Sequence, residues 1–227
     1  MLFQNLVPSP ALSIAQFSDI DSFRPVEFVA DARSVPLNLV NFHTARATVQ
    51  LPCCQITALA SFARIVDVSY RMAHGALIFQ LEDDHEVSAN GMSVNGPAFI
   101  GMRGNVDIQF FEPRGSLHAI LTFGVGLRDR EWFETPDRLC GFTPDRGALA
   151  AVRSVATSIL RTASSEPHLM KEPGFALALQ ESLLLAIDDM FRRSRTAEIS
   201  SRTASKSYCR LVRMVDEQGK MVAPMAF

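Results

Sequence analysis

The sequence predicts an α+β fold in which an antiparallel β-barrel is followed by an antiparallel helical hairpin. From Pro36 to Phe123, hydrophobic residues alternate with polar ones or form runs of strand length. Turn-forming residues separate these segments at short intervals, which favours an antiparallel barrel or sandwich over alternating strands and helices. After Thr143 the hydrophobic period changes to three and four residues, as in amphipathic helices.

The first 35 residues are expected to form an irregular N-terminal arm. Pro8, Pro10 and Pro25 interrupt this stretch, and proline removes a backbone donor from any helix or sheet that it enters. Residues 17–31 could hold a short helix, but the prolines favour an extended segment. We therefore predict that residues 1–35 form an arm that covers the barrel.

Residues 36–142 are predicted to form the barrel. Six segments have strand-like patterns: residues 36–42, 45–51, 54–60, 76–82, 107–111 and 117–123. Four turn signals accompany them: Asn90-Gly91, Asn95-Gly96, Arg103-Gly104-Asn105 and Glu112-Pro113-Arg114-Gly115. A small apolar barrel is either solid or encloses one small molecule.

Five residues of the predicted barrel are candidates for a ligand pocket: Phe62, Arg64, Tyr70, Phe79 and Phe111. The aromatic side chains suit a pocket lining as well as a solid core. Arg64 lies in a largely apolar stretch, as does Arg71. If either faced inward, it would need an anion to pair with, whereas the alternative is that both face solvent.

Residues 143–193 are predicted to form the helical hairpin. Thr143 is a suitable N-cap, Pro144 suits the first helical position, and the helix would run through Arg161. A polar break over 164–174 separates it from a second helix over 174–193. The apolar face of this second helix is wider than one neighbouring helix needs. We therefore expect it to pair with a second copy of the chain through Leu179, Leu183, Ile187 and Met190. The alternative is that this face packs wholly onto the barrel and the first helix.

Composition excludes several classes of protein. The chain has 227 residues, 48% hydrophobic and 20% charged, with a net charge of −2, which excludes a disordered chain, a fibrous protein and a polybasic coat protein. Its apolar runs are shorter than a transmembrane helix needs, and the N-terminus lacks the basic start of a secretory signal. We expect a cytoplasmic protein without a membrane partner, whose cysteines are reduced and mostly buried.

Motifs for catalysis and metal binding are missing from the sequence. The histidines do not form the H-x-H pair of a metal site on a strand, and the acidic run 82–86 lacks the ligand spacing of a calcium loop. There is no nucleophile elbow, phosphate-binding loop or dinucleotide fingerprint. We therefore expect no metal, no cofactor, no catalytic residues and no enzymatic activity.

The order of the segments resembles a known family. Asn90-Gly91-Met92-Ser93-Val94-Asn95-Gly96-Pro97 precedes Phe99-Ile100, and the loop 112–115, the helical hairpin and a basic linker follow. The segment Ser207–Glu217 then begins one more helix. This arrangement is similar to the N-terminal sensing and dimerisation region of AraC-family transcriptional regulators. The resemblance implies a jelly-roll, cupin-like barrel that holds an effector, helices that pair two subunits, and helix-turn-helix units that read a promoter.

The C-terminal residues 194–227 are predicted to be a basic linker and the truncated start of a DNA-binding region. Residues 192–227 contain eight basic and three acidic residues, although the rest of the chain is acidic overall. The sequence ends ten residues after Glu217, where the family continues into its helix-turn-helix units.

The resemblance therefore implies a ligand-sensing and dimerisation domain of an AraC-like regulator that lacks a complete DNA-binding domain, as a fragment or a naturally truncated protein. Its expected partners are an unidentified small-molecule effector and a second copy of the chain, and it would contact DNA only through a helix-turn-helix region absent from this sequence. One alternative is a metal-free, cupin-like small-molecule-binding protein or enzyme. Another is a subunit that pairs with a full-length homologue and deprives it of one DNA-binding arm.

Overall fold

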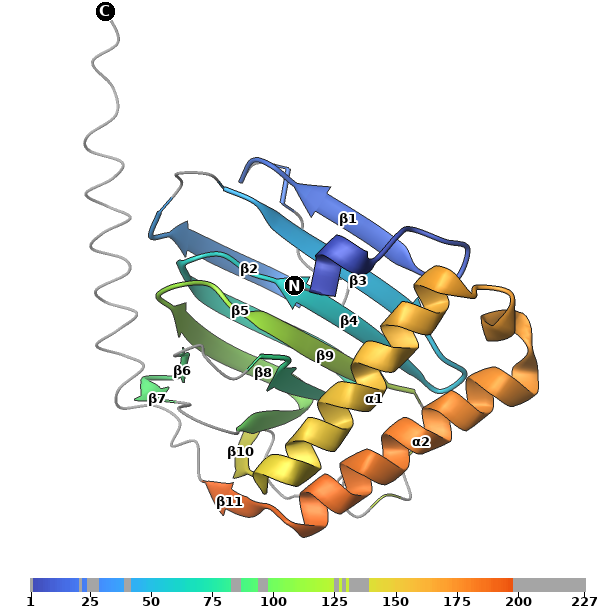
Figure 1. Cartoon of the computed structure of the whole chain (residues 1–227). Helices are drawn as coiled ribbons and strands as arrows, with labels where there is room; N and C mark the ends of the chain where they lie inside the picture. The colour runs from blue at the N-terminus through green and yellow to red at the C-terminus, as the bar shows by residue number, and fades with distance from the viewer. Residues whose placement is uncertain are drawn as a thin grey trace, which may run out of the picture.

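The computed structural model describes residues 2–20, 22–23, 29–38, 42–82, 87–93, 98–124, 127, 130 and 139–197. Over these residues, one antiparallel sheet of 11 strands curls into a half-barrel, and two antiparallel helices cover one face of it (Figure 1). The predicted α+β class, with a cupin-like barrel followed by a helical hairpin, is confirmed.

The order of the strands in the sheet differs from their order in the sequence, because β9 lies between β4 and β5. They are β1 (Ser13–Phe17), β2 (Val29–Pro36), β3 (Thr44–Gln50), β4 (Cys54–Ala60), β5 (Arg64–Gln80), β6 (Ser88–Ala89), β7 (Met92–Ser93), β8 (Phe99–Glu112), β9 (Leu117–Phe123), β10 (Leu139–Thr143) and β11 (Arg195–Ala197). The sheet order is β1-β3-β4-β9-β5-β8-β10-β11, and β2 pairs with β5, while β6 pairs with β7 and β8. The helices are the 3₁₀ turns η1 (Leu2–Asn5) and η4 (Leu169–Lys171) and the α-helices α1 (Arg146–Ser165) and α2 (Pro173–Arg192).

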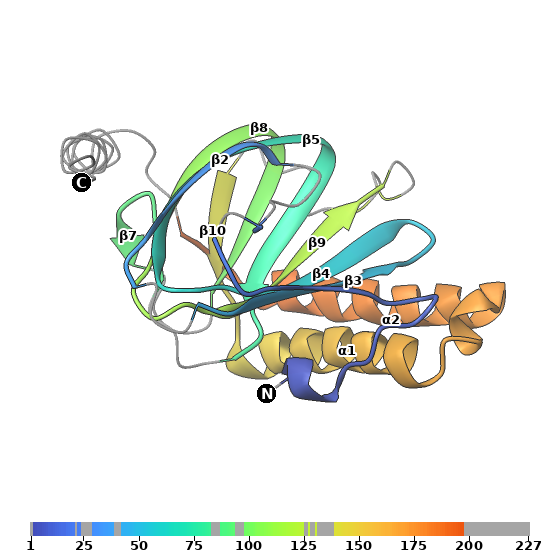
Figure 2. The ribbon, with the colours of Figure 1, turned by 90° about the horizontal axis from the view of Figure 1, so that it is seen from above.

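The curl of the sheet comes from the two long strands β5 and β8. The first half of β5 pairs with β2, and its second half pairs with β9, while β8 follows β5 along both halves. The register between β5 and β8 shifts between Arg71 and Gly75, where the partner of β5 changes. Such an irregularity bends a strand. Figure 2 shows β2, β5 and β8 arching away from the helices and enclosing the barrel interior.

Alternate residues of the central strands serve two separate hydrophobic cores. Leu77 of β5 and Leu121 of β9 face the helices, whereas their neighbours Ile78 and Ile120 face the barrel. Side chains on successive strand residues point to opposite faces, so an unbroken apolar run is what a sheet covered on both faces requires. This explains why residues 76–82 and 117–123 form runs rather than a simple alternation.

The helical hairpin begins two residues later than predicted. Thr143 ends β10, and the N-cap of α1 is Asp145, whose carboxylate accepts from the backbone N–H groups of Gly147 (2.9 Å) and Ala148 (3.2 Å). The predicted N-cap at Thr143 is therefore wrong, because residues up to 143 still pair with β8 and β11. The second helix, predicted over 174–193, lies at Pro173–Arg192.

The N-terminal arm is the largest correction to the predicted fold. It contributes two strands to the sheet, because β1 pairs with β3 and β2 pairs with the first half of β5. Residues 2–12 also lie against α1, where the Ser9 Oγ donates to the Ala163 carbonyl (2.6 Å) and Leu12 is buried. Sheet pairing thus outweighs the irregular local pattern. Pro8 and Pro10 do not interrupt a strand, because both precede β1, and Pro25 lies outside the described residues.

Among the turn signals, Asn90-Gly91 is a hairpin turn with φ values of 50° and 78°, as predicted. The predicted turn at residues 103–105 is wrong, since these residues lie within β8. The strand predicted at 36–42 is not found in the part of that range that the structure describes, apart from Pro36. Asn95-Gly96, Cys209 and the predicted linker and helix start after residue 197 lie outside the described residues, and β11 occupies the first part of that linker.

Two further observations concern the predicted environment. None of the helices in the described part of the chain is both long and apolar enough to cross a membrane. Cys53, Cys54 and Cys140 are free thiols, and burial raises the pKa of Cys54 to about 12, so its thiol stays protonated at neutral pH.

Candidate ligand-binding site

A cavity of about 270 Å³ lies inside the barrel, on the face of the sheet opposite the helices. Its walls come from β2, β3, β4, β5, β8 and β9, and they are mainly apolar side chains such as Val66, Val68, Ile78, Phe110 and Ile120. A 150 Å³ apolar cavity holds benzene. At the same cavity volume per non-hydrogen atom, this cavity has room for a molecule of about ten such atoms.

A buried ion pair lines part of the cavity. The Arg64 Nε donates to the Glu112 Oε2 at 2.6 Å, and the two residues are only 7% and 3% exposed. Arg64 begins β5 and Glu112 ends β8, and the two are direct partners in the sheet register, so the strands themselves hold the pair together. The Arg64 guanidinium also lies over the rings of Phe23 (5.9 Å) and Phe62 (5.2 Å).

The second oxygen of Glu112 is held by two serines. Its Oε1 accepts from the Ser116 Oγ (2.8 Å) and the Ser61 Oγ (3.1 Å), and the Ser116 N–H donates to the Ser61 Oγ (2.8 Å). The turn between β8 and β9 makes this possible. Gly115 has φ +73°, and a Cβ there would lie 2.6 Å from the Ser61 carbonyl oxygen, so this predicted turn requires glycine.

His118 of β9 completes the cluster, which we call the polar end: Ser61, Arg64, Glu112, Ser116 and His118. The His118 Nδ1 lies 3.1 Å from the Ser116 Oγ and 3.8 Å from the Glu112 Oε1. Every member except Ser61 lines the cavity. In the described part of the chain, no group of three or more His, Cys, Asp or Glu residues is placed to hold a metal ion.

Burial and charge set the protonation states of the polar end. Burial lowers the pKa of His118 to about 4, so the ring is neutral at neutral pH. Burial alone would raise the pKa of Glu112, but the Arg64 charge and the hydrogen bonds from Arg64 and Ser116 hold it below its ordinary 4.5. Burial raises the pKa of Tyr70, which keeps that hydroxyl neutral. The polar end therefore holds one positive and one negative charge.

We expect the stability of the protein to fall on acidification through His118. The pKa of His118 is about 4 in the folded protein and ordinarily 6.5. Between these pH values the unfolded chain binds a proton that the folded protein does not bind, so acidification stabilises the unfolded state relative to the folded one. The loss should be about 3 kcal/mol by pH 4. Urea denaturation from pH 7 to pH 4 measures it. His118→Asn should flatten the slope, whereas the same change at the exposed His168 should not. Equal slopes for wild type and His118→Asn would contradict the expectation.

The structure brings three of the five predicted pocket residues to the cavity. Arg64, Tyr70 and Phe79 line it. Phe62 is not among the lining residues and instead lies beneath the Arg64 guanidinium. Phe111 is also absent from the lining, because its neighbours Phe110 and Glu112 face the cavity and strand residues alternate in direction.

The anion that Arg64 needs comes from the chain itself, whereas Arg71 is exposed. Glu112, Ser116 and His118 were not among the predicted site residues. The two-residue period of a strand is the signal that could have found Glu112 and His118. Glu112 lies one residue beyond the segment 107–111, and His118 lies within the segment 117–123.

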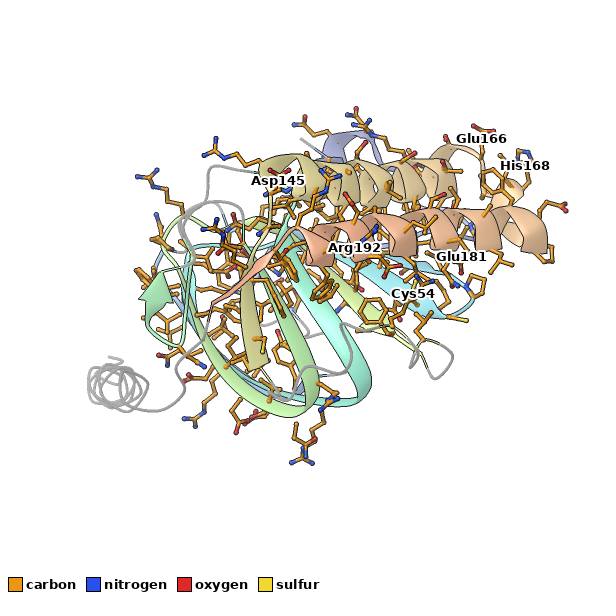
Figure 3. All side chains as sticks on the ribbon, turned by 90° about the horizontal axis from the view of Figure 1, so that it is seen from below. Cys54, Asp145, Glu166, His168, Glu181 and Arg192 are labelled. Carbon is orange, nitrogen blue, oxygen red and sulfur yellow. The ribbon has the colours of Figure 1, made fainter. Side chains whose placement is uncertain are left out.

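The predicted dimer residues lie mainly in the core of the chain. Leu183, Ile187 and Met190 are 0% exposed, and Leu179 is partly buried against the same core. The first three therefore cannot present their side chains to a second copy while the chain keeps this fold. Figure 3 shows α1 and α2 side by side, with Asp145 and Arg192 at one end of the hairpin and Glu166 and His168 at the other. In the described part of α2, the large hydrophobic side chains left exposed are Leu177 (47%) and Leu185 (62%).

Comparison with known proteins supports the fold. No protein-family model and no curated protein matches the sequence. Among solved structures, the crystal structure of AerE from Microcystis aeruginosa matches with 15% identity over 53% of this chain and 56% of that one, but its TM-score of 0.30 is too low to carry an argument. The AraC-like transcriptional activator CuxR matches with a TM-score of 0.51 and 8% identity, over 83% of this chain and 71% of that one. The chain therefore has the fold of an AraC-like transcriptional activator, as the resemblance in its sequence predicted.

Proposed function

We propose that this protein is the effector-binding domain of an AraC-like transcriptional regulator, and that the barrel cavity is where a small, mainly apolar effector binds. The observation that carries the proposal is the cavity in the barrel with its polar end. The fold likeness to CuxR, described as an AraC-like transcriptional activator, supports the regulatory role.

The contrast between the two cores favours a binding role for the cavity. Protein interiors are normally packed without large voids. The helix-side core follows this rule, with Val152, Ile159 and Leu183 fully buried, while the opposite face of the same sheet lines a cavity of about 270 Å³. A buried ion pair adds little stability compared with well-packed apolar residues, so Arg64 and Glu112 are better explained by recognition of a bound molecule.

The hydrogen bonds favour binding over the enzymatic alternative. An activated serine nucleophile gives its proton to a neighbouring base. Here the Ser116 hydroxyl is closest to the Glu112 carboxylate, which also binds Arg64, so Ser116 donates to a charge-stabilised acceptor with a lowered pKa. Such a carboxylate is a weak base. These contacts suit a rigid recognition site better than nucleophilic catalysis.

The proposal is tested by filling the cavity. Val68 lines the cavity, so we expect Val68→Phe to fill it, keep the stability within about 1 kcal/mol of wild type, and abolish binding of propylbenzene measured by calorimetry. Val152 is 0% exposed in the packed helix-side core, so the matched Val152→Phe should cost about 1–3 kcal/mol and leave propylbenzene binding in place. If wild type fails to bind propylbenzene and both variants are equally destabilised, the barrel is solid and the proposal fails.

The regulatory role has a separate test in the source cell. Transcript profiling should identify genes whose levels change when this gene is deleted, and Val68→Phe, which leaves the fold intact, should change the same genes. A deletion that alters no transcript would contradict the role of a regulator.

A further inference from the structure

We propose that the polar end selects a neutral head group that accepts a hydrogen bond from Arg64 and donates one to His118, such as a primary amide, a lactam or an un-ionised acid. The inference rests on the proposed binding function and adds the chemical class of the effector. It is carried by the hydrogen-bond network of the polar end, taken one donor and one acceptor at a time.

The network defines which nitrogen of His118 carries the proton. The Ser116 Oγ lies 2.8 Å from the Glu112 Oε1, 3.1 Å from the His118 Nδ1 and 3.2 Å from the Ser61 Oγ. Its single proton goes to the carboxylate, which is the closest of the three and the only charged acceptor. The Ser116 Oγ has no second proton to give and can only accept from the His118 Nδ1 at 3.1 Å. The neutral ring carries one proton, which is therefore on Nδ1. A proton there also faces the Glu112 Oε1 at 3.8 Å, which favours the same tautomer.

The other ring nitrogen, Nε2, is then an acceptor with an open lone pair. In the part of the chain that the structure describes, Nε2 has no hydrogen-bond partner. The fully buried side-chain atoms without a partner do not include Nε2, so this nitrogen is still accessible. His118 lines the cavity and keeps 11% of its side-chain surface. We conclude that the cavity presents this acceptor to a bound molecule.

Arg64 supplies the complementary donors. Its hydrogen bond to the described residues runs from Nε to Glu112, which leaves the N–H groups of both terminal nitrogens for another acceptor. Arg64 and His118 are both held by the same Glu112 carboxylate, one on each oxygen, so donor and acceptor lie at the same end of the cavity. A third polar atom, the Ser34 Oγ on β2, also lines the cavity and has no partner among the described residues.

The charges of the polar end disfavour an anionic head group. Glu112 already neutralises Arg64, and His118 is neutral, so a carboxylate bound at the polar end would add a negative charge that no residue of this end compensates. Arg46 of β3 also lines the cavity, but it lies over the Phe17 ring and is not part of the polar end. A bound carboxylate would also place a second acceptor against the His118 Nε2. An amide presents a carbonyl to Arg64 and an N–H to His118 without adding charge.

The inference is tested with three probes of equal size and shape: 3-phenylpropanamide, the ketone 4-phenylbutan-2-one and 3-phenylpropanoate. Calorimetry at neutral pH, in two buffers of different ionisation enthalpy, reports the affinity and any proton uptake. We expect the amide to bind about threefold to tenfold more tightly than the ketone, since one hydrogen bond is lost. We expect the carboxylate to bind at least about tenfold more weakly than the amide. The amide should bind without proton uptake.

The matched variant is His118→Asn, whose side-chain amide can still donate to Ser116 but has no equivalent of the Nε2 acceptor. It should bind the amide and the ketone equally. Because this variant could unfold, the tautomer is also measured directly in wild type by ¹⁵N NMR of the imidazole, where we expect a protonated Nδ1 and an unprotonated Nε2.

Each contrary result has a defined meaning. Tighter binding of the carboxylate than of the amide without uptake of a proton, equal affinity of wild type for amide and ketone, or a protonated Nε2 overturns the inference, but leaves ligand binding intact. If propylbenzene and all three probes fail to bind, the proposed function itself fails.

Discussion

Replacing Glu112 with glutamine should lower the free energy of unfolding by about 3–5 kcal/mol. The carboxylate accepts from Arg64, Ser61 and Ser116, and the two charged partners are almost fully buried. Glutamine keeps the shape but removes the charge, and its single carbonyl oxygen can accept either from Arg64 or from the two serines, but not from both sides. The Arg64 charge would then be buried without compensation. Urea denaturation at neutral pH measures the change.

Two controls separate this effect from a general sensitivity to substitution. Glu166→Gln, the same change at an exposed residue, should alter stability by less than about 0.5 kcal/mol. The double variant Arg64→Met with Glu112→Leu removes both charges and should recover most of the loss, because apolar residues can replace a buried ion pair. An effect of Glu112→Gln no larger than that of Glu166→Gln would show that Arg64 is not buried in the barrel.

Leu183→Ala should destabilise the protein by about 2–5 kcal/mol, whereas Leu185→Ala, two residues further along α2, should change stability by less than about 0.5 kcal/mol. Leu183 is 0% exposed in the core between the helices and the sheet, and Leu185 is 62% exposed. The same chemical change is thus made once in the core and once on the surface. Urea denaturation at low protein concentration gives both values.

Alanine variants of α2 also test where a second copy would bind. The dimer expected from the sequence remains a proposal, and the side chains of α2 that are open to it are Leu177 and Leu185. Light scattering should show that replacing both by alanine weakens any self-association of the folded protein. A Leu183→Ala variant that is fully stable but monomeric, beside a dimeric wild type, would instead place the predicted inner face at the interface.

The central part of the fold could be predicted because its sequence signals are local. The runs at 54–60 and 117–123 became β4 and β9, and the change of hydrophobic period after Thr143 marked the helical hairpin. The strands β1 and β2 were missed because their pairing with β3 and β5 is decided by distant parts of the chain. The turn signal at 103–105 failed because Gly104, despite its positive φ of 71°, continues a strand bound to β5.

The site could be predicted only in part for the same reason. The position of Arg64 in an apolar stretch pointed to a buried cation with an anionic partner. That partner, Glu112, is 48 residues away in the sequence, and only the register between β5 and β8 brings the two together. The predicted dimer face on α2 was reasoned from the width of the apolar stripe alone. That width is explained by two neighbours, since α2 packs on α1 and, through Phe191, on Phe99 and Phe142 of the sheet.

Crystallography under xenon pressure tests most directly whether the barrel is open to a ligand. Xenon enters apolar cavities of this kind without needing any specific contact. We expect a xenon atom inside the barrel, bounded by Val68, Ile78 and Ile120, and none in the packed core around Ile159 and Leu183. A barrel without xenon, filled by its own side chains, would contradict the proposed binding function.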